Sequence, residues 1–173
     1  VLFRSAHYHL IINHFPIIIP MIGAIVLIVG LLAKNSILKR TAYCLFVFGA
    51  LFSYIASVTG EGAEEVVENM KQVSENLMHN HEEWAEKFAL VNYLMAIISI
   101  VAGWISYKKK SDPLFITLIL LFTCTVGIYL GIQTGNTGGQ IMHTEIRDHA
   151  TISTENNQTI SNDKEAKEKN EDD

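Results

Sequence analysis

The stretch "LFITLILLFTCTVGIYLGI" at residues 114–132 decides the fold, because it contains no charged residue and no histidine. An α-helix needs about 20 residues to cross the hydrocarbon core of a membrane. A soluble helix of this length would carry a polar face, and this one carries none. Three further runs have the same character, at about residues 15–33, 41–58 and 88–107. The sequence therefore predicts an all-α protein, an integral membrane four-helix bundle.

The loops between these runs predict the orientation in the membrane. Three basic residues lie within residues 34–40 and three within residues 108–110, whereas residues 60–87 hold eight Glu and two Lys. Short loops rich in Lys and Arg stay in the cytoplasm. We therefore expect both termini on the outer side. The first run is longer than the apolar part of a signal peptide and is expected to be retained. Nothing in the net charge of −5 suggests a nucleic-acid partner.

The outer loop and the tail differ in pattern from the spans. Thr59 is a plausible N-cap that precedes several acids, and apolar residues recur at helical spacing from Ala63 to Val73. This pattern predicts a short amphipathic helix that caps the outer face of the bundle. Residues 150–173 are polar, acidic and poor in apolar side chains, which predicts a disordered tail. The membrane domain is therefore expected to cover residues 1–149.

All seven histidines fall on the expected outer side, in three separate parts of the chain. They are His7, His9, His14, His79, His81, His143 and His149. Helical bundles build haem and metal sites from side chains on facing helices, and haem iron accepts axial imidazoles. For a single histidine, a polar residue at the lipid head groups is the simpler interpretation. Three groups on one face favour a binding site.

Glycines accompany the last of these histidines. Gly127, Gly131 and Gly135 share one helical face and favour close helix packing. Gly135, Gly138 and Gly139 follow the last span, where we expect either a turn or a backbone that folds tightly under a planar cofactor. The two cysteines, Cys44 and Cys124, are expected at different depths, too far apart for a disulfide, and we interpret them as buried packing residues.

Acidic residues near the histidines leave a second interpretation open. Carboxylates and imidazoles together bind iron, zinc or copper in helical bundles. Such a non-haem site would serve a sensor, a carrier or a metal-dependent oxidase, with Glu145 also able to orient His143. Its candidate ligands are His14, His81, His143, Glu61, Glu65, Glu68, Glu82 and Glu145. A third interpretation is a structural subunit of a respiratory membrane complex.

Several motifs resemble one protein family. The stretch "HLIINHFP" from His9 resembles the H-x4-H-F-P opening of a widespread bacterial family of four-helix membrane proteins of unknown function, often suspected of binding haem b. The family pattern continues with a glycine after the second span, a histidine before the third, and Gly-Gly and a histidine after the fourth. The stretches "TGEGAEE", "HEEWAE" and "GNTGGQIMHTEI" are similar to a Bacteroidetes-type branch. This resemblance implies a bacterial inner membrane with both termini in the periplasm. It nominates the ligands His9, His14, His81 and His143.

These observations lead to one hypothesis about function. We expect an outward-facing haem b site that transfers electrons between a quinone or other membrane donor, such as a respiratory complex, and a periplasmic redox protein. An electron-transfer or binding protein is favoured over a stand-alone enzyme. We expect His14 and His81 as one axial pair, with His9 and His143 as a second pair or in support. Gly135, Gly138 and Gly139 are expected to lie against the cofactor.

Overall fold

The computed structural model describes residues 2–68, 75–109 and 114–143 and contains no strand within these ranges. Four helical segments are long and apolar enough to cross a membrane, so the chain is a multi-pass membrane protein. The predicted all-α four-helix bundle is confirmed, and each predicted span lies inside a helix apart from Ala33, which follows the end of the first one. The helices are α1 (Leu2–Ile12), α2 (Phe15–Leu32), α3 (Ser36–Glu68), α4 (Glu75–Lys109) and α5 (Leu114–Met142).

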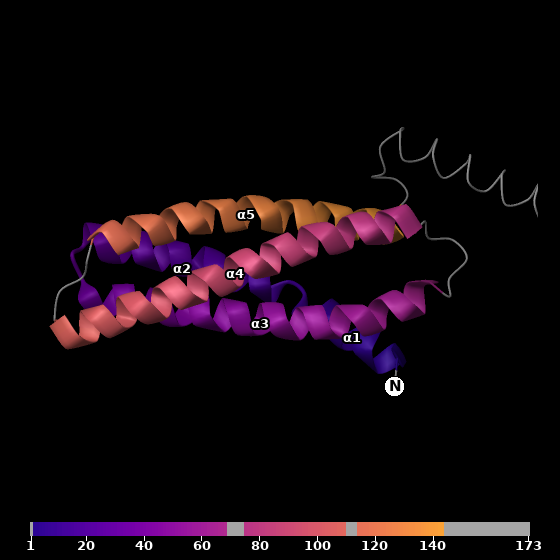
Figure 1. The fold of residues 1–173 in the computed structure, drawn as a ribbon, viewed down its shortest axis with the longest axis horizontal. Coiled ribbons are helices and arrows are strands. Elements are labelled where there is room, and N and C mark those ends of the chain that lie inside the picture. The colour runs from indigo at the N-terminus through magenta and orange to yellow at the C-terminus, as the bar shows by residue number, and fades with distance from the viewer. Residues whose placement is uncertain (1, 69–74, 110–113, 144–173) are drawn as a thin grey trace, which may run out of the picture.

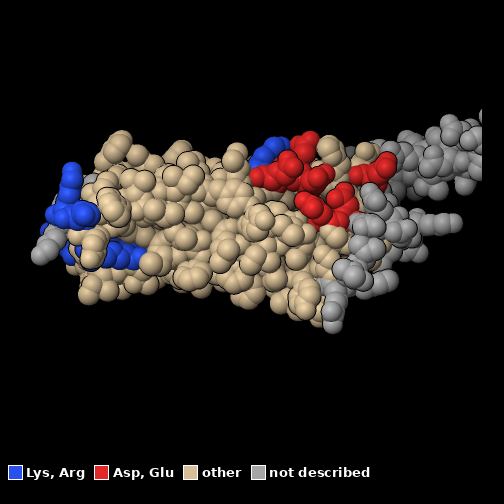
Figure 2. All heavy atoms as spheres, turned by 60° about the horizontal axis from the view of Figure 1, so that its bottom comes forward, with Lys and Arg blue, Asp and Glu red and all other residues tan. Residues whose placement is uncertain are grey.

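The four long helices run side by side along the molecule (Figure 1). Helix α2 packs along α3, α3 along α4, and α4 along α5, while α5 closes the bundle against α2. Short α1 packs against the outer part of α3. Lys and Arg side chains gather at one end and acidic side chains near the other (Figure 2), as the loop compositions predict.

A break separates α1 from α2 at Asn13 and His14. Pro16 lies in the first turn of α2 and has no N–H to donate, and its ring would clash with the carbonyl of Ile12 in a continuous helix. Helix α1 therefore ends at Ile12 and leans on α3 as a separate element. Because of this break, His9 and His14 do not belong to one continuous helix.

The helices continue beyond the predicted spans at the outer end, which corrects two expectations. Residues 59–68 belong to α3, so no separate capping helix begins at Thr59. The Thr59 hydroxyl donates to the carbonyl of Ile55 (2.9 Å) inside the helix instead of capping a new one. Gly135, Gly138 and Gly139 all lie within α5 and form no turn. The predicted tail, residues 150–173, lies outside the described residues.

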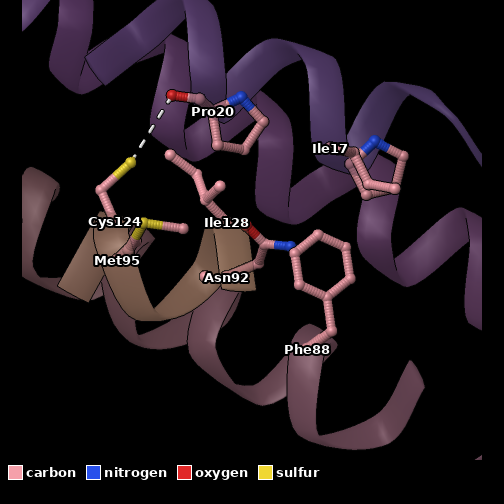
Figure 3. A pocket seen from close by; sticks show the side chains of 9 residues that line it. Ile17, Pro20, Phe88, Asn92, Met95, Cys124 and Ile128 are labelled. Atoms are coloured by element: carbon pink, nitrogen blue, oxygen red, sulfur yellow. Dashed lines mark hydrogen bonds between the residues drawn. The ribbon is translucent and has the colours of Figure 1, made fainter. Parts of the chain in front are cut away.

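The centre of the bundle is closely packed (Figure 3). Phe88, Met95 and Cys124 line a cavity of about 10 Å³, which holds at most one water molecule. The thiol of Cys124 lies 3.8 Å from the carbonyl oxygen of Pro20, and Cys124 is buried as predicted. Cys44 is exposed on the surface of the bundle, so its predicted burial is wrong. This central cavity therefore leaves no room for a cofactor.

Candidate functional site: two histidines at the outer end

His9 reaches from α1 to the outer turns of α3. Its half-buried ring places Nδ1 3.0 Å from the carbonyl oxygen of Ala56 and 3.3 Å from Oγ1 of Thr59. A carbonyl oxygen only accepts hydrogen bonds, so Nδ1 carries the proton and donates it. The neutral ring then keeps the lone pair of Nε2 for a ligand or metal.

The Thr59 hydroxyl uses its proton within its own helix, so towards His9 it can only accept a hydrogen bond. It donates to backbone oxygens of its own helix, at 2.9 Å for Ile55 and 3.1 Å for Ala56. Its oxygen is therefore left to accept from His9. The carbonyl and the hydroxyl together hold the ring in one orientation and one tautomer.

His81 makes the same contacts from α4 to α5. Its Nδ1 lies 3.1 Å from the carbonyl oxygen of Thr134 and 3.2 Å from Oγ1 of Thr137. The Thr137 hydroxyl donates to Gln133 (3.0 Å) and Thr134 (3.1 Å) within α5. His81 is half-buried as well, and its Nε2 is likewise left without the ring proton.

A glycine lies under each imidazole. A Cβ atom added to Gly60 would lie 3.3 Å from Cε1 of His9, and one added to Gly138 would lie 3.0 Å from Cε1 of His81. Each contact is tighter than ordinary van der Waals packing. Glycine is therefore needed at both positions so that the ring can lie directly against the neighbouring helix.

The two half-sites form a structural repeat. In each, the histidine ring contacts three residues of one helical segment. These are a residue whose carbonyl accepts from Nδ1, a threonine three positions later, and the glycine that follows the threonine. The segments are "ASVTG" at 56–60 and "TGNTG" at 134–138. The threonine follows the histidine by 50 residues in the first half and by 56 in the second. The sequence analysis missed this repeat, although the recurring Thr-Gly pair after each outer histidine was a signal for it.

The two histidines also lie near each other. His9 and His81 are close enough to interact electrostatically, although they come from α1 and α4. Both of these helices pack against α3. The structure therefore assembles a pair of imidazoles, each with Nδ1 anchored to the backbone of a neighbouring helix.

The other histidines take different positions. His14 is exposed at the N-cap of α2 and makes no capping hydrogen bond with its side chain. His79 is exposed and lies 3.8 Å from Glu82 and 3.5 Å from Glu83 on its own helix. His143 is exposed at the end of α5, where its backbone N–H bonds to the carbonyl of Gly139 (3.0 Å). The electrostatic influence on His81 thus comes from His9, whereas the sequence analysis expected His14 and His81 as an axial pair.

The carboxylates of the alternative metal site are not gathered in the described part of the chain. Glu61 and Glu82 are exposed, while the side chains of Glu65 and Glu68 and all of Glu145 lie outside the described residues. Within residues 2–68, 75–109 and 114–143, no group of three or more His, Cys, Asp or Glu side chains is placed to hold a metal ion. For Gly135, expected against a cofactor, no described atom beyond its own stretch of helix lies within 4 Å of an added Cβ.

Comparison with known proteins adds no relative. No protein-family model matches the chain, and no curated protein and no solved structure is significantly similar to it. The resemblance to the H-x4-H-F-P family stays a prediction, and the function has to be argued from the paired histidines.

Proposed function

We propose that the chain is a membrane cytochrome that binds haem b between His9 and His81. The paired half-sites carry this proposal. Histidines that bind haem iron or other metals through one ring nitrogen usually donate a hydrogen bond from the N–H of the other to a carbonyl or similar acceptor. This bond fixes the tautomer and orients the ring. Both histidines make this bond, to Ala56 and to Thr134. Two such imidazoles can hold a haem iron without a carboxylate ligand.

The protein residues have a defined task in this proposal. A bound haem supplies one-electron chemistry. The Nε2 atoms of His9 and His81 would hold the haem iron, while Thr59 and Thr137 keep the ring protons on Nδ1. Gly60 and Gly138 let each ring lie against its helix, so that the two nitrogens are presented between the helices.

The position of the pair suggests the direction of electron transfer. His9 on α1 and His81 near the start of α4 lie at one end of the bundle (Figure 1). The opposite end holds the connection between α2 and α3 and the end of α4, and Lys and Arg side chains gather there (Figure 2). By the charge rule for membrane proteins this basic end faces the cytoplasm. The haem site then faces the periplasm across a bacterial inner membrane, and both termini lie on that side. Electrons would pass from a membrane donor such as a quinol to a periplasmic redox protein.

Absorption spectra of the detergent-purified protein test this proposal. The wild type should show a sharp α-band after dithionite reduction and bind haem in stoichiometric amount. Replacement of His9 or His81 by Ala should remove the six-coordinate spectrum, whereas His14→Ala should retain it because His14 is exposed elsewhere.

Metal analysis of the same samples separates the alternatives. Glu82→Ala serves as a carboxylate control, and haem content should not change in it because Glu82 is exposed. Stoichiometric iron, zinc or copper without a Soret band would instead support the non-haem site. Unchanged haem content in both the His9 and the His81 variants would overturn the proposed ligation.

A further inference from the structure

A second cavity lies between α3 and α4, far along the bundle from the paired histidines. It is an open groove of about 380 Å³, within the size range of small-molecule sites. Its lining includes Arg40 near the start of α3 and Tyr107 near the end of α4, and Val47 and Ser99 lie farther along the same two helices. The groove opens on the apolar surface, so a ligand would enter it from the lipid.

Aromatic side chains and one glycine shape the groove. Tyr43 is buried, while Phe48 and Tyr107 are 54% and 73% exposed on its open side. Gly103 has no side chain to fill the space, since a Cβ added there would only reach ordinary contact with Tyr43 at 3.8 Å. The walls therefore suit a flat, largely apolar group that packs against aromatic rings.

Ser99 supplies the observation that points to a ligand. Its side chain lines the groove and is 1% exposed, yet its hydroxyl has no hydrogen-bond partner among the described residues. Several other hydroxyls in the spans bond to a carbonyl of their own helix, as Thr123 does to Ile119 (2.8 Å). A buried hydroxyl without a partner is costly. An acceptor atom of a bound molecule would satisfy it.

The charges of the residues that line the groove narrow the chemical class of its ligand. Arg40 donates from Nε to Oγ of Ser106 (2.9 Å) and from Nη2 to its carbonyl oxygen (2.8 Å), so the guanidinium is held at the rim. The lining contains no carboxylate and no histidine. A ligand must therefore offer hydrogen-bond acceptors and need not carry a positive charge.

We propose that this groove binds the head group of an isoprenoid quinone. A quinone ring is flat and apolar, and its carbonyl oxygen accepts from the Ser99 hydroxyl while the tail leaves into the lipid. A phospholipid fits less well. Ser99 lies seven residues from Ser106, or roughly 10 Å along the helix. A phosphate at Arg40 would therefore place an acyl chain without acceptors opposite Ser99. This inference goes beyond the proposed function, and the binding does not require haem.

The chain contains its own reporter for this site. Trp104 is next to Gly103 and 65% exposed, and the other tryptophan, Trp84, lies near the paired histidines. In a Trp84→Phe protein, decylubiquinone should quench the fluorescence of Trp104 in a saturable manner. Ser99→Ala should raise the Kd about fivefold, as expected for one lost hydrogen bond. Gly103→Leu should abolish saturable quenching because its side chain fills the groove.

Controls make each outcome decisive. Thr125→Ala removes a hydroxyl that bonds only to its own helix and should leave the Kd unchanged. An unchanged Kd in both the Ser99 and the Gly103 variants would overturn the proposal. Displacement of the quinone by one equivalent of phosphatidylglycerol would also overturn the proposal, because it would identify the groove as a lipid site. Saturable quenching in a haem-free His81→Ala protein would support the quinone site and contradict nothing in it. Haem binding by a wild-type protein that shows no saturable quenching would overturn the quinone site and leave the proposed cytochrome function standing.

Discussion

The imidazole of His81 donates from Nδ1 to the backbone oxygen of Thr134 at 3.1 Å. This bond joins the beginning of the third span to the end of the fourth. His9 makes the equivalent bond to Ala56 at 3.0 Å and joins α1 to α3. Each histidine is thus held by backbone of a different helix, so ligand binding at the site depends on how the helices pack. The predictions below follow from this arrangement and from the packing beneath it.

Replacement of Thr137 by Val should shift the redox potential of a bound haem. The Thr137 oxygen lies 3.2 Å from Nδ1 of His81 and accepts from it, which makes the ring a stronger donor to iron. Loss of this bond should favour the reduced state and raise the midpoint potential by on the order of 20 mV. Redox titration of the α-band measures the shift. Thr125→Val in the same helix is the control, and an equal shift in both would rule out a specific role for Thr137.

Replacement of Gly138 by Ala should weaken haem binding by about tenfold. The new Cβ would lie 3.0 Å from Cε1 of His81, so the ring must move away from α5. Gly135→Ala should retain haem because its Cβ meets no atom within 4 Å. Haem content after purification measures both effects. If Gly135 instead lies against the cofactor, as its place in the sequence suggested, the Gly135 variant would lose haem as well.

Replacement of Gly49 by Val should destabilise the bundle without removing a ligand. A Cβ at Gly49 would lie 2.6 Å from Cγ of Pro20, whose ring cannot rotate away. Helices α2 and α3 would have to separate, at a cost of about 1–3 kcal/mol. Thermal unfolding in detergent, followed by circular dichroism, should show a lower midpoint. Gly103→Ala is the comparison, since its Cβ would only come within ordinary van der Waals distance of Tyr43. An equal fall in the unfolding midpoint of both variants would contradict this account.

The hydrogen bond between Asn92 and Ser53 should contribute modestly to stability. Nδ2 of Asn92 donates to Oγ of Ser53 at 2.8 Å, and both residues are buried between α4 and α3. Interhelical hydrogen bonds of this kind in membranes average about 0.6 kcal/mol. A double-mutant cycle with Asn92→Ala and Ser53→Ala should return a coupling of that size. A coupling indistinguishable from zero would mean that the bond does not stabilise the bundle.

The extent of the helices could be predicted only in part from the sequence. The spans were predictable because a stretch such as residues 114–132 is almost entirely apolar and has no charged side chain. The last turns of α3 could not be predicted as helix, because Thr59 and the glycines after it are typical of a helix start or a loop. They remain helical where α1 packs against α3, with Gly60 beneath His9. Packing overrides local preference there.

The sequence by itself determined the fold class, the clustering of charge at the two ends and the placement of the histidines at one end. These features follow from composition, because apolar runs and charged loops partition differently between lipid and water. Only the tertiary structure decided which histidines meet. The break before Pro16 sends α1 onto α3, so that His9 comes near His81 while His14 is exposed at the start of α2. Pairing depends on helix direction and on contacts between residues some fifty positions apart, which no local pattern contains.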